Sequence, residues 1–276
     1  MNFIEDIIEN TKSIRPLIHN INNYVTANDC ANVILACGGA PIMADDPCEV
    51  EEITAVSNAL VINLGTISRS KAEAMILAGR KANELKIPVI FDPVGIGASS
   101  FRSSITAKLL KEVHFDVIKG NLTEIKTLIK WEHSSGGVDA DKGDVIEESS
   151  MEQAIHIAEK VAEETDSVIV ITGAIDIICS KGRVHMVRNG SKLMKRITGT
   201  GCMLSSVIGA FCGGNPSNCF EAAVTAVGAM GLCGELAENK VLKKNEGTGS
   251  FKVYLMDYMS SLQGNTLKEG IRIESK

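Results

Sequence analysis

A turn of small residues, Ile-Thr-Gly-Thr-Gly-Cys at positions 197–202, carries the residue types best suited to chemistry in this 276-residue sequence. It runs directly into an uncharged segment with the pattern of a buried helix. The first N–H groups of a helix lack partners and together carry about half a positive charge, and glycines let a phosphate approach them. Gly199, Thr200 and Gly201 therefore predict an anion site, although a single Gly-x-Gly is more often a plain turn.

Cys202 stands where this helix should begin, so it is a candidate for catalysis. Cysteines at helix N-termini are more reactive than cysteines buried among apolar residues. The alternative is a packing residue like the other seven cysteines, because the chain has eight and no pair is spaced C-x-x-C. We expect reduced thiols that mostly pack as small apolar groups. The five histidines are scattered, and a zinc site is not expected.

Two further motifs place acidic and amide side chains after apolar runs. In Phe-Asp-Pro-Val-Gly, Asp92 precedes a proline that keeps it extended. It either makes a local turn hydrogen bond or faces a ligand near Mg²⁺ or a reacting hydroxyl. In Gly-Asn-Leu-Thr-Glu, Asn121 and Glu124 have the spacing of a capping box. They could equally organise water around Mg²⁺ beside a nucleotide.

Alternating elements must position these motifs. Continuous β-branched runs predict buried parallel strands at 59–65, 87–95, 115–121 and 166–173, and helical patterns lie at 67–85, 122–130 and 151–164. This repeated β-α order predicts a three-layer α/β/α fold with a mostly parallel sheet. Ligands of such sheets sit beyond the carboxyl ends of the strands. That rule brings Asp92, Lys119, Asn121 and Thr172 together with the turn at Gly199.

The remaining segments complete a single domain over residues 1–276. A Ser-Lys-Gly turn predicts an antiparallel hairpin at 176–188, placed at one edge of the sheet, and apolar patterns predict helices at 202–212, 220–239 and 250–262. The uncharged stretch 197–220 is long enough to span a bilayer, but its glycines and Pro216 favour a buried helix followed by a turn. The polar segment 133–149 is either a flap or a plain connection.

Composition excludes several classes of function. The net charge is −6 without a long basic run, so neither nucleic acid nor a membrane is expected as a partner. The N-terminus is acidic and amphipathic and lacks the features of a signal peptide, which favours a cytoplasmic location. The sequence contains no GxGxxG, GxxxxGK[ST] or GxSxG motif, and this argues against Rossmann, P-loop and α/β-hydrolase sites.

In order along the chain, these blocks closely resemble the hydroxyethylthiazole kinase family of the ribokinase-like superfamily. The resemblance runs from PLIHNINNYVTANDCANVILACGGAPIMADDP through VIFDPVGIGAS, VIKGNLTEI and VIVITGAIDII to ITGTGCMLSSVIGAF. It implies a ribokinase-like fold and phosphorylation of 4-methyl-5-(2-hydroxyethyl)thiazole by ATP with Mg²⁺. The product would be the thiazole phosphate used in thiamine salvage. The family is also known as a homotrimer with active sites at subunit interfaces.

The resemblance also implies roles for individual residues. The turn from Gly199 to Cys202, with Thr200 and Gly201, would be the anion hole, and Gly199 would also contact substrate. Cys202 would be the base, at a position where most of the superfamily has Asp. Other implied roles are nucleotide binding by Lys119, Thr172 and Asn121, Mg²⁺ and phosphate contacts by Asp92 and Glu124, and thiazole contacts by Asn23 and Met43.

The sequence departs from the family at Lys119, where arginine is usual. Arginine binds phosphate oxygens in a bidentate manner, whereas lysine acts as a point charge. We expect the activity to survive because the cationic character is preserved. Three alternatives to the thiazole kinase are a kinase for another small alcohol such as a hydroxymethylpyrimidine, an ADP-dependent repair dehydratase, and a non-catalytic nucleotide or thiazole sensor.

Overall fold

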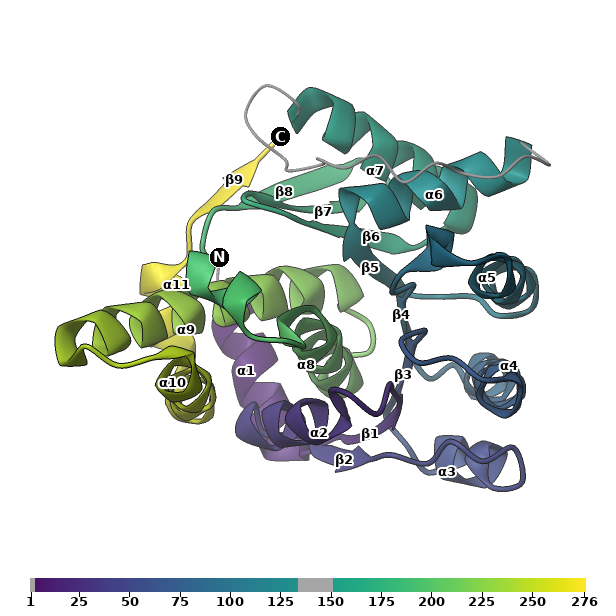
Figure 1. Cartoon of the computed structure of the whole chain (residues 1–276), viewed down its shortest axis with the longest axis horizontal. Coiled ribbons are helices and arrows are strands. Elements are labelled where there is room, and N and C mark those ends of the chain that lie inside the picture. The colour runs from purple at the N-terminus through teal and green to yellow at the C-terminus, as the bar shows by residue number, and fades with distance from the viewer. Residues whose placement is uncertain (1–2, 134–150) are drawn as a thin grey trace.

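The computed structural model describes residues 3–133 and 151–276, and one nine-stranded sheet organises them (Figure 1). The strand order is β2-β1-β3-β4-β5-β6-β7-β8-β9. The pairings from β2 to β6 are parallel, and those from β6 to β9 are antiparallel. The strands are β1 (Leu17–Ile21), β2 (Ala40–Ile42), β3 (Ala59–Asn63), β4 (Val89–Asp92), β5 (Val117–Asn121), β6 (Val168–Thr172), β7 (Asp176–Ser180), β8 (Arg183–Val187) and β9 (Ile273–Ser275).

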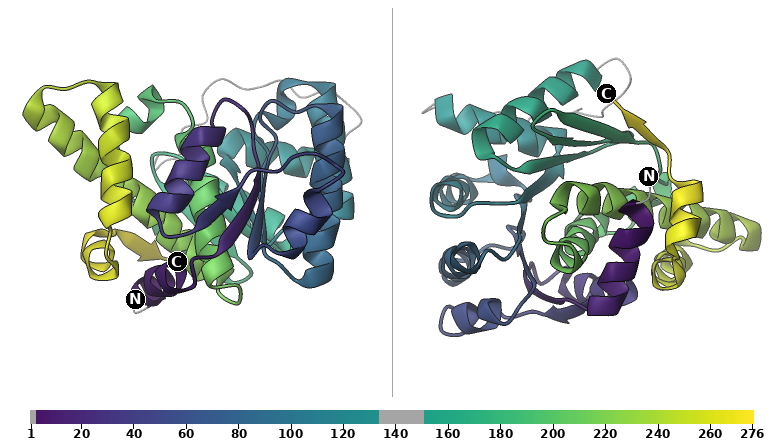
Figure 2. Two further views of the ribbon diagram at one scale, coloured as in Figure 1. Left: turned by 90° about the horizontal axis from the view of Figure 1, so that it is seen from below. Right: turned by 180° about the vertical axis from the view of Figure 1, so that it is seen from behind.

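Helices cover both faces of this sheet (Figure 1). One layer contains α3 (Val50–Ala55), α4 (Arg69–Leu85), α5 (Ser100–Glu112), α6 (Leu122–His133) and α7 (Met151–Thr165). The other contains α1 (Phe3–Ile14), α2 (Ala27–Ala36), α8 (Thr200–Gly214) and α9 (Cys219–Lys244), with α10 (Thr248–Ser261) and α11 (Gly264–Gly270) outside them (Figure 2). Within the described residues, short 3-10 helices lie at Ile96–Ala98 and Lys192–Arg196.

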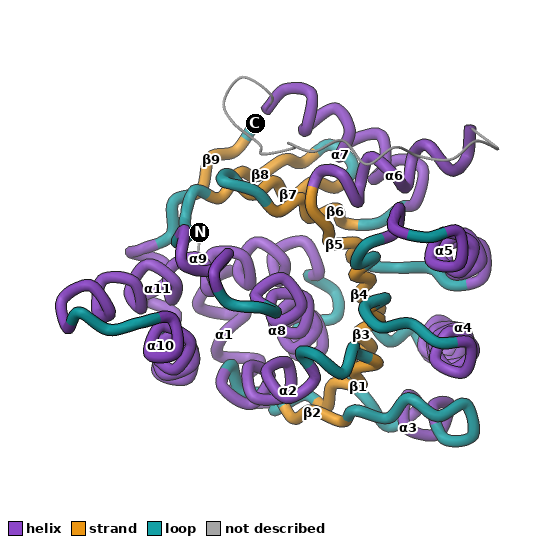
Figure 3. The backbone as a smooth tube through the Cα atoms, viewed as in Figure 1, coloured by secondary structure: helices purple, strands orange, loops and turns teal. Residues whose placement is uncertain are grey.

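The two helical layers enclose separate apolar cores on opposite faces of the sheet. Alternate side chains of a strand point to opposite faces, so Val61 and Ile90 belong to the core beneath α8 and Leu60 and Phe91 to the other. Strands covered on both sides have no polar face, and this explains the continuous apolar runs in the sequence. The expected three-layer α/β/α fold is confirmed, with the sheet running between the helices in Figure 3.

Helix α8 occupies the centre of its layer and carries the glycine-rich motif. Residues 203–214 are all buried, and a Cβ at Gly209 would approach Val61 Cγ2 to 2.4 Å. Glycine is therefore required where this helix crosses β3 so closely. The stretch 197–220 forms a buried helix and a turn, as expected. One described helix, α9, has the length and apolar character of a membrane span, yet 78% of that window is buried inside the protein.

The structure also differs from the sequence-based expectation at both ends of the chain. The N-terminal segment contributes β1 and β2, which the apolar pattern did not reveal. The hairpin at 176–188 is antiparallel as predicted, but β9 pairs with β8 and forms the edge of the sheet. Helix α8 begins at Thr200, two residues before the expected start. Apart from His133 at the end of α6, the expected loop at 133–149 lies outside the described residues.

Candidate active site

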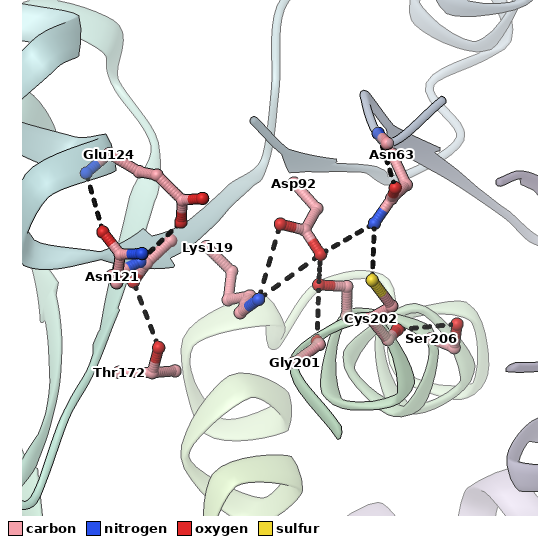
Figure 4. A network of polar contacts seen from close by, with 12 residues as sticks. Asn63, Asp92, Lys119, Asn121, Glu124, Thr172, Gly201, Cys202 and Ser206 are labelled. Atoms are coloured by element: carbon pink, nitrogen blue, oxygen red, sulfur yellow. Dashed lines mark hydrogen bonds and ion pairs between the residues drawn. The ribbon is translucent and has the colours of Figure 1, made fainter. Parts of the chain in front are cut away.

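The carboxyl ends of the parallel strands and the start of α8 enclose a cavity of about 480 Å³. Asp92 ends β4, Asn121 ends β5 and Thr172 ends β6, and all three line it. Gly199 and Cys202 close it from the α8 side. Other lining residues are Asn23, Val25, Thr26, Gly65, Thr66, Val94, Arg102, Lys119, Glu124, Thr198 and Gly201. The strand-end rule thus brings the expected motifs together (Figure 4).

Gly199 shapes the entry into α8. Its φ of +89° lies in the left-handed region, and a Cβ there would come within 2.7 Å of Thr26 Cγ2. Only glycine meets both constraints without strain. A Cβ at Gly201 would lie 3.1 Å from Lys119 Nζ, so the lysine ammonium reaches the first turn of α8. The helix N-terminus and this cation together favour a negatively charged ligand.

Asp92 and Lys119 form a buried ion pair inside the cavity. Lys119 Nζ lies 3.3 Å from Asp92 Oδ2, and their side chains are 5% and 0% exposed. Burial acts to lower the pKa of Lys119, but the charges of Asp92 and Glu124 outweigh it, so the pKa of Lys119 is raised. Asp92 Oδ2 also accepts hydrogen bonds from Asn63 Nδ2 at 3.0 Å and Ser205 Oγ at 2.7 Å. The pair is therefore fixed and charged.

Asn121 and Glu124 form a capping box at the start of α6. Asn121 Oδ1 accepts from the Glu124 N–H at 2.8 Å, and Glu124 Oε2 accepts from the Asn121 N–H at 2.8 Å. Glu124 Oε1 accepts from the Gly95 N–H at 3.0 Å. Burial raises the pKa of Glu124, with Lys119 opposing that shift. The capping interpretation is confirmed, and the same carboxylate also faces the cavity.

Cys202 differs from the buried cysteines because it is half-buried and lines the cavity. Its Sγ accepts hydrogen bonds from Asn63 Nδ2 at 3.3 Å and Asn23 Nδ2 at 3.4 Å. Elsewhere, burial raises the pKa of Cys37 to about 12 and that of Cys233 to about 12. The chain thus contains inert packing thiols and one thiol held in a polar cavity.

Two of the sequence-based site residues are separated by the fold. Asn23 reaches the cavity, whereas Met43 lies just after β2 and is not among the residues that line it.

Sequence reasoning missed Asn63, which contacts both Asp92 and Cys202. Asn63 ends β3 as Asp92 ends β4, so the strand-end rule could have found it. It also missed Arg102, whose Nη1 donates to the Leu64 and Val94 carbonyl oxygens.

A second cavity of about 790 Å³ adjoins the first. Asn121, Thr172 and Gly201 line both cavities, so the start of α8 lies where the two meet. The second cavity is also lined by residues 173–174, 176, 188–192 and 194–195, and by the face of α9 that carries Val227. Asp176 lines it and accepts a hydrogen bond from the Gly173 N–H at 2.9 Å. Burial raises the pKa of Asp176 to about 7.

Solved structures define the class of this fold. A ribokinase-like superfamily protein from Enterococcus faecalis superposes with a TM-score of 0.61 at 12% identity, over 94% of this chain and 95% of that one. That level of identity shows the fold alone. The architecture is therefore ribokinase-like, with the cavities at the carboxyl edge of the sheet.

Closer relatives identify the family. The model of the hydroxyethylthiazole kinase family matches residues 8–265. The chain is 48% identical to the hydroxyethylthiazole kinase of Clostridium acetobutylicum over 99% of both chains, and 45% identical to that of Clostridium beijerinckii over 98% of this chain and 96% of the relative. The structure of the hydroxyethylthiazole kinase from Pyrococcus horikoshii matches with a TM-score of 0.88 and 33% identity over 100% of both chains. The chain belongs to the hydroxyethylthiazole kinase family and is a phosphotransferase.

Proposed function

We propose that this enzyme phosphorylates the hydroxyethyl group of 4-methyl-5-(2-hydroxyethyl)thiazole with ATP, which yields the thiazole phosphate for thiamine salvage. One observation carries the proposal beyond family membership. The N-terminus of α8 meets the buried Asp92–Lys119 pair at the junction of two cavities. A phosphoryl group at that junction would face helix N–H groups and a lysine ammonium, with an acceptor alcohol on one side and a nucleotide on the other.

The smaller cavity suits the thiazole alcohol, and the larger suits the nucleotide. Asn23 and Gly199 border only the smaller cavity, together with the base candidate Cys202. Thr200 borders the larger cavity, and Thr172 borders both. Asn121 and Gly201, which also line both cavities, would contact the polyphosphate, with the Lys119 ammonium beside Gly201.

The chemistry proposed is an in-line transfer at this junction. The alcohol oxygen forms a bond to the γ-phosphorus while the bond from that phosphorus to the β,γ-bridging oxygen breaks, and ADP leaves. The N–H groups from Gly199 to Cys202 and the Lys119 ammonium would stabilise the charge on the equatorial oxygens. The hydroxyl proton would pass to Cys202 Sγ late in the reaction, because the transition state is loose and the alcohol is a weak acid.

The acidic residues of the cavity fit a magnesium ion that enters with the nucleotide. Among the described residues, no three His, Cys, Asp or Glu side chains are grouped as a metal site. Mg²⁺ usually keeps several waters and binds one or two carboxylates together with substrate phosphates. Asp92 Oδ1 accepts only a long 3.4 Å hydrogen bond from Lys119 Nζ among the described contacts, so it retains capacity for a cation. Asp92 and Glu124 would hold the ion, which would neutralise phosphate charge when bound.

We also propose a homotrimer in which a neighbouring copy completes the thiazole pocket. Met43 does not line the cavity of its own chain, although the family resemblance assigns it to the pocket. Val25 lines the cavity mouth with 55% exposure, and the adjacent Tyr24 is 79% exposed. A second copy covering this apolar rim would remove it from water. A monomer in sedimentation at micromolar protein would contradict this arrangement.

We also propose that residues 1–276 form a single domain and that the protein is cytoplasmic.

A coupled ADP-release assay tests the proposed reaction. The purified enzyme is given ATP, Mg²⁺ and either the thiazole alcohol or one of a panel of other alcohols that includes a hydroxymethylpyrimidine. We expect ADP release that depends on the thiazole alcohol and proceeds with the highest kcat/KM for it. Preferred turnover of another alcohol would change the substrate. Nucleotide binding without alcohol-dependent ADP release would indicate a sensor.

A further inference from the structure

We infer that Asn63 is a positioning residue that holds the Cys202 sulfur as a hydrogen-bond acceptor and ties it to Asp92. The inference rests on the proposed phosphoryl transfer and deepens it. Asn63 is the last residue of β3 and is 1% exposed. It does not line either cavity, so it would act through Cys202 and Asp92 without touching substrate. In Figure 4, dashed lines join its amide nitrogen to both of these residues.

Hydrogen bonds fix which end of the Asn63 amide faces the sulfur. Asn63 Oδ1 lies 2.9 Å from the Gly65 backbone nitrogen, which can only donate. Asn63 Nδ2 lies 3.0 Å from Asp92 Oδ2, and an ionised carboxylate can only accept. If the amide were turned over, its Nδ2 would face the Gly65 N–H, which is also a donor, and its Oδ1 would face Asp92 Oδ2, which is also an acceptor. The orientation therefore follows from its partners, and Nδ2 is the atom 3.3 Å from Cys202 Sγ.

The two hydrogens of Asn63 Nδ2 match two acceptors. One is directed to Asp92 Oδ2 and the other to Cys202 Sγ. Since Asn63 is buried, water cannot replace either bond without a change in structure. A proton on the sulfur would have to point away from Asn63. This leaves the sulfur arranged to accept, as a base requires.

Asn23, the second donor to this sulfur, is bound differently. Its Nδ2 lies within hydrogen-bond distance of Asn22 Oδ1 at 3.1 Å, Asn63 Oδ1 at 3.0 Å and Cys202 Sγ at 3.4 Å. Two hydrogens cannot fully serve three acceptors. Asn23 also lines the cavity, where it can contact a ligand. Asn63 is thus the dedicated donor to Cys202, and Asn23 is a shared one.

The same hydrogen-bond network links the Cys202 sulfur to the Asp92 carboxylate, which pairs with Lys119. Asp92 Oδ2 receives Asn63 Nδ2, Ser205 Oγ and Lys119 Nζ. Ser205 follows Cys202 by one turn of α8, so the helix and the ends of β3 and β4 are connected through one carboxylate oxygen. Movement of Asn63 would therefore displace the base candidate relative to the phosphoryl site.

The test uses Asn63→Asp, which preserves size and the acceptor for Gly65 but removes the amide donor. The matched control is Asn20→Asp on neighbouring β1. Asn20 is also 1% exposed, and its Nδ2 donates to Ser206 Oγ, a hydroxyl that can turn to donate instead. Both variants bury a carboxyl on adjacent parallel strands, where Asn20 pairs with Val61, two residues before Asn63. Thermal unfolding is measured for each, and Asn63→Ala, which adds no charge, takes the place of Asn63→Asp if the latter does not fold.

The first measurement is the alkylation rate of Cys202 by iodoacetamide in the free enzyme, followed by mass spectrometry of its peptide. We expect roughly a tenfold slower rate in the Asn63 variant, because a sulfur anion loses a charge-assisted hydrogen bond. The control should stay within about twofold of wild type. An unchanged or faster rate in the Asn63 variant, or an equal loss in the control, would overturn the positioning role.

The second measurement is steady-state kinetics with the thiazole alcohol. We expect kcat to fall roughly tenfold while KM changes less than about threefold, because Asn63 does not contact the bound alcohol. A rise in KM without a fall in kcat would contradict the inference. If Cys202→Ser retained full turnover, the base role of the proposed function would fail. The alkylation experiment would still report whether Asn63 positions the sulfur.

Discussion

The two cavities that meet at the start of α8 are built in different ways. The smaller is lined by side chains at the ends of parallel strands, and it contains the buried ion pair of Asp92 and Lys119. The larger is lined by turns and by one face of α9, and its lysines, Lys192 and Lys195, are exposed. The first has a fixed arrangement of charge, whereas the second offers shape and a few polar atoms. This suits chemistry in one cavity and holding of a nucleotide in the other.

The difference follows from how each cavity is anchored. Strand ends in one parallel sheet are held at fixed spacing by the ladder of backbone hydrogen bonds, so side chains such as Asn63 and Asp92 are positioned accurately. Turns lack that ladder. Substitutions in the smaller cavity should therefore change kcat, and substitutions in the larger should change binding or stability.

The largest effect is expected for Asp92→Asn. The change removes the charge that pairs with Lys119 and the proposed Mg²⁺ contact, while the side-chain shape is kept. We expect kcat to fall roughly 10³-fold, measured by ADP release. The control is Asp116→Asn at the opposite end of the sheet, where Asp116 Oδ2 accepts from the Val89 N–H. A comparable loss in the control would show a general stability effect.

Cys202→Ser should have the next largest effect. Serine retains a small polar group but is a poorer proton acceptor, so we expect kcat to fall about 10²-fold. Cys202→Asp should retain or raise activity, since a carboxylate is almost fully ionised at neutral pH. Wild-type turnover in the serine variant would remove the base role.

Gly199→Ala should lower kcat/KM by roughly tenfold to a hundredfold. The new Cβ would meet Thr26 and move the N–H groups of the proposed anion hole. Gly182→Ala is a matched control, because Gly182 also has a positive φ, of +74°, but nothing lies within 4 Å of its Cβ position. It should cost about 1–2 kcal/mol of stability and leave kcat/KM near wild type. Equal losses of activity would mean that backbone strain alone matters.

The smallest effect on turnover is expected for Asp176→Asn in the larger cavity. Its main effect should be on how the stability of the protein depends on pH. The pKa of Asp176 is raised to about 7 from its ordinary 3.8 by burial, so the folded state binds this proton more tightly than the unfolded state. The stabilisation it gives is complete below pH 4 and is lost as pH rises to about 7. A change of one in pKa corresponds to about 1.4 kcal/mol, so the free energy of unfolding should fall by at most about 4 kcal/mol.

The measurement is the free energy of unfolding by urea at pH 5 and pH 8. Wild type should lose more stability than Asp176→Asn between these values, because the amide does not ionise. Parallel curves for the two proteins would contradict a raised pKa at this site. The comparison also tests whether the larger cavity tolerates a change of charge.

The parallel strands were predictable from the sequence where they consist of unbroken apolar runs. Strand β3 is fully buried and was expected, whereas β1 contains His19 and Asn20 and was missed. His19 is accommodated by Thr54 Oγ1 and the Ala44 carbonyl oxygen, both distant in sequence. A polar residue with such partners can lie inside a strand, and no local pattern reveals them.

The site was predictable in part for a related reason. Asp92, Asn121 and Thr172 stand at the ends of recognisable strands, and their convergence follows from parallel topology. The capping box of Asn121 and Glu124 follows from their spacing of three. The strand-end rule also applies to Asn63, but its hydrogen bonds to Asp92 and Cys202 join residues far apart in sequence, and only the fold reveals them.

The sequence by itself determined the alternation of strands and helices, the glycine turn before α8 and the family resemblance, because local spacing and composition carry them. Only the tertiary structure decided that Cys202 accepts from Asn63, that Lys119 is buried against Asp92, and that Met43 lies outside the cavity of its own chain. Those contacts join residues far apart in sequence. Their geometry depends on how closely α8 packs on the sheet, which is a property of the whole fold.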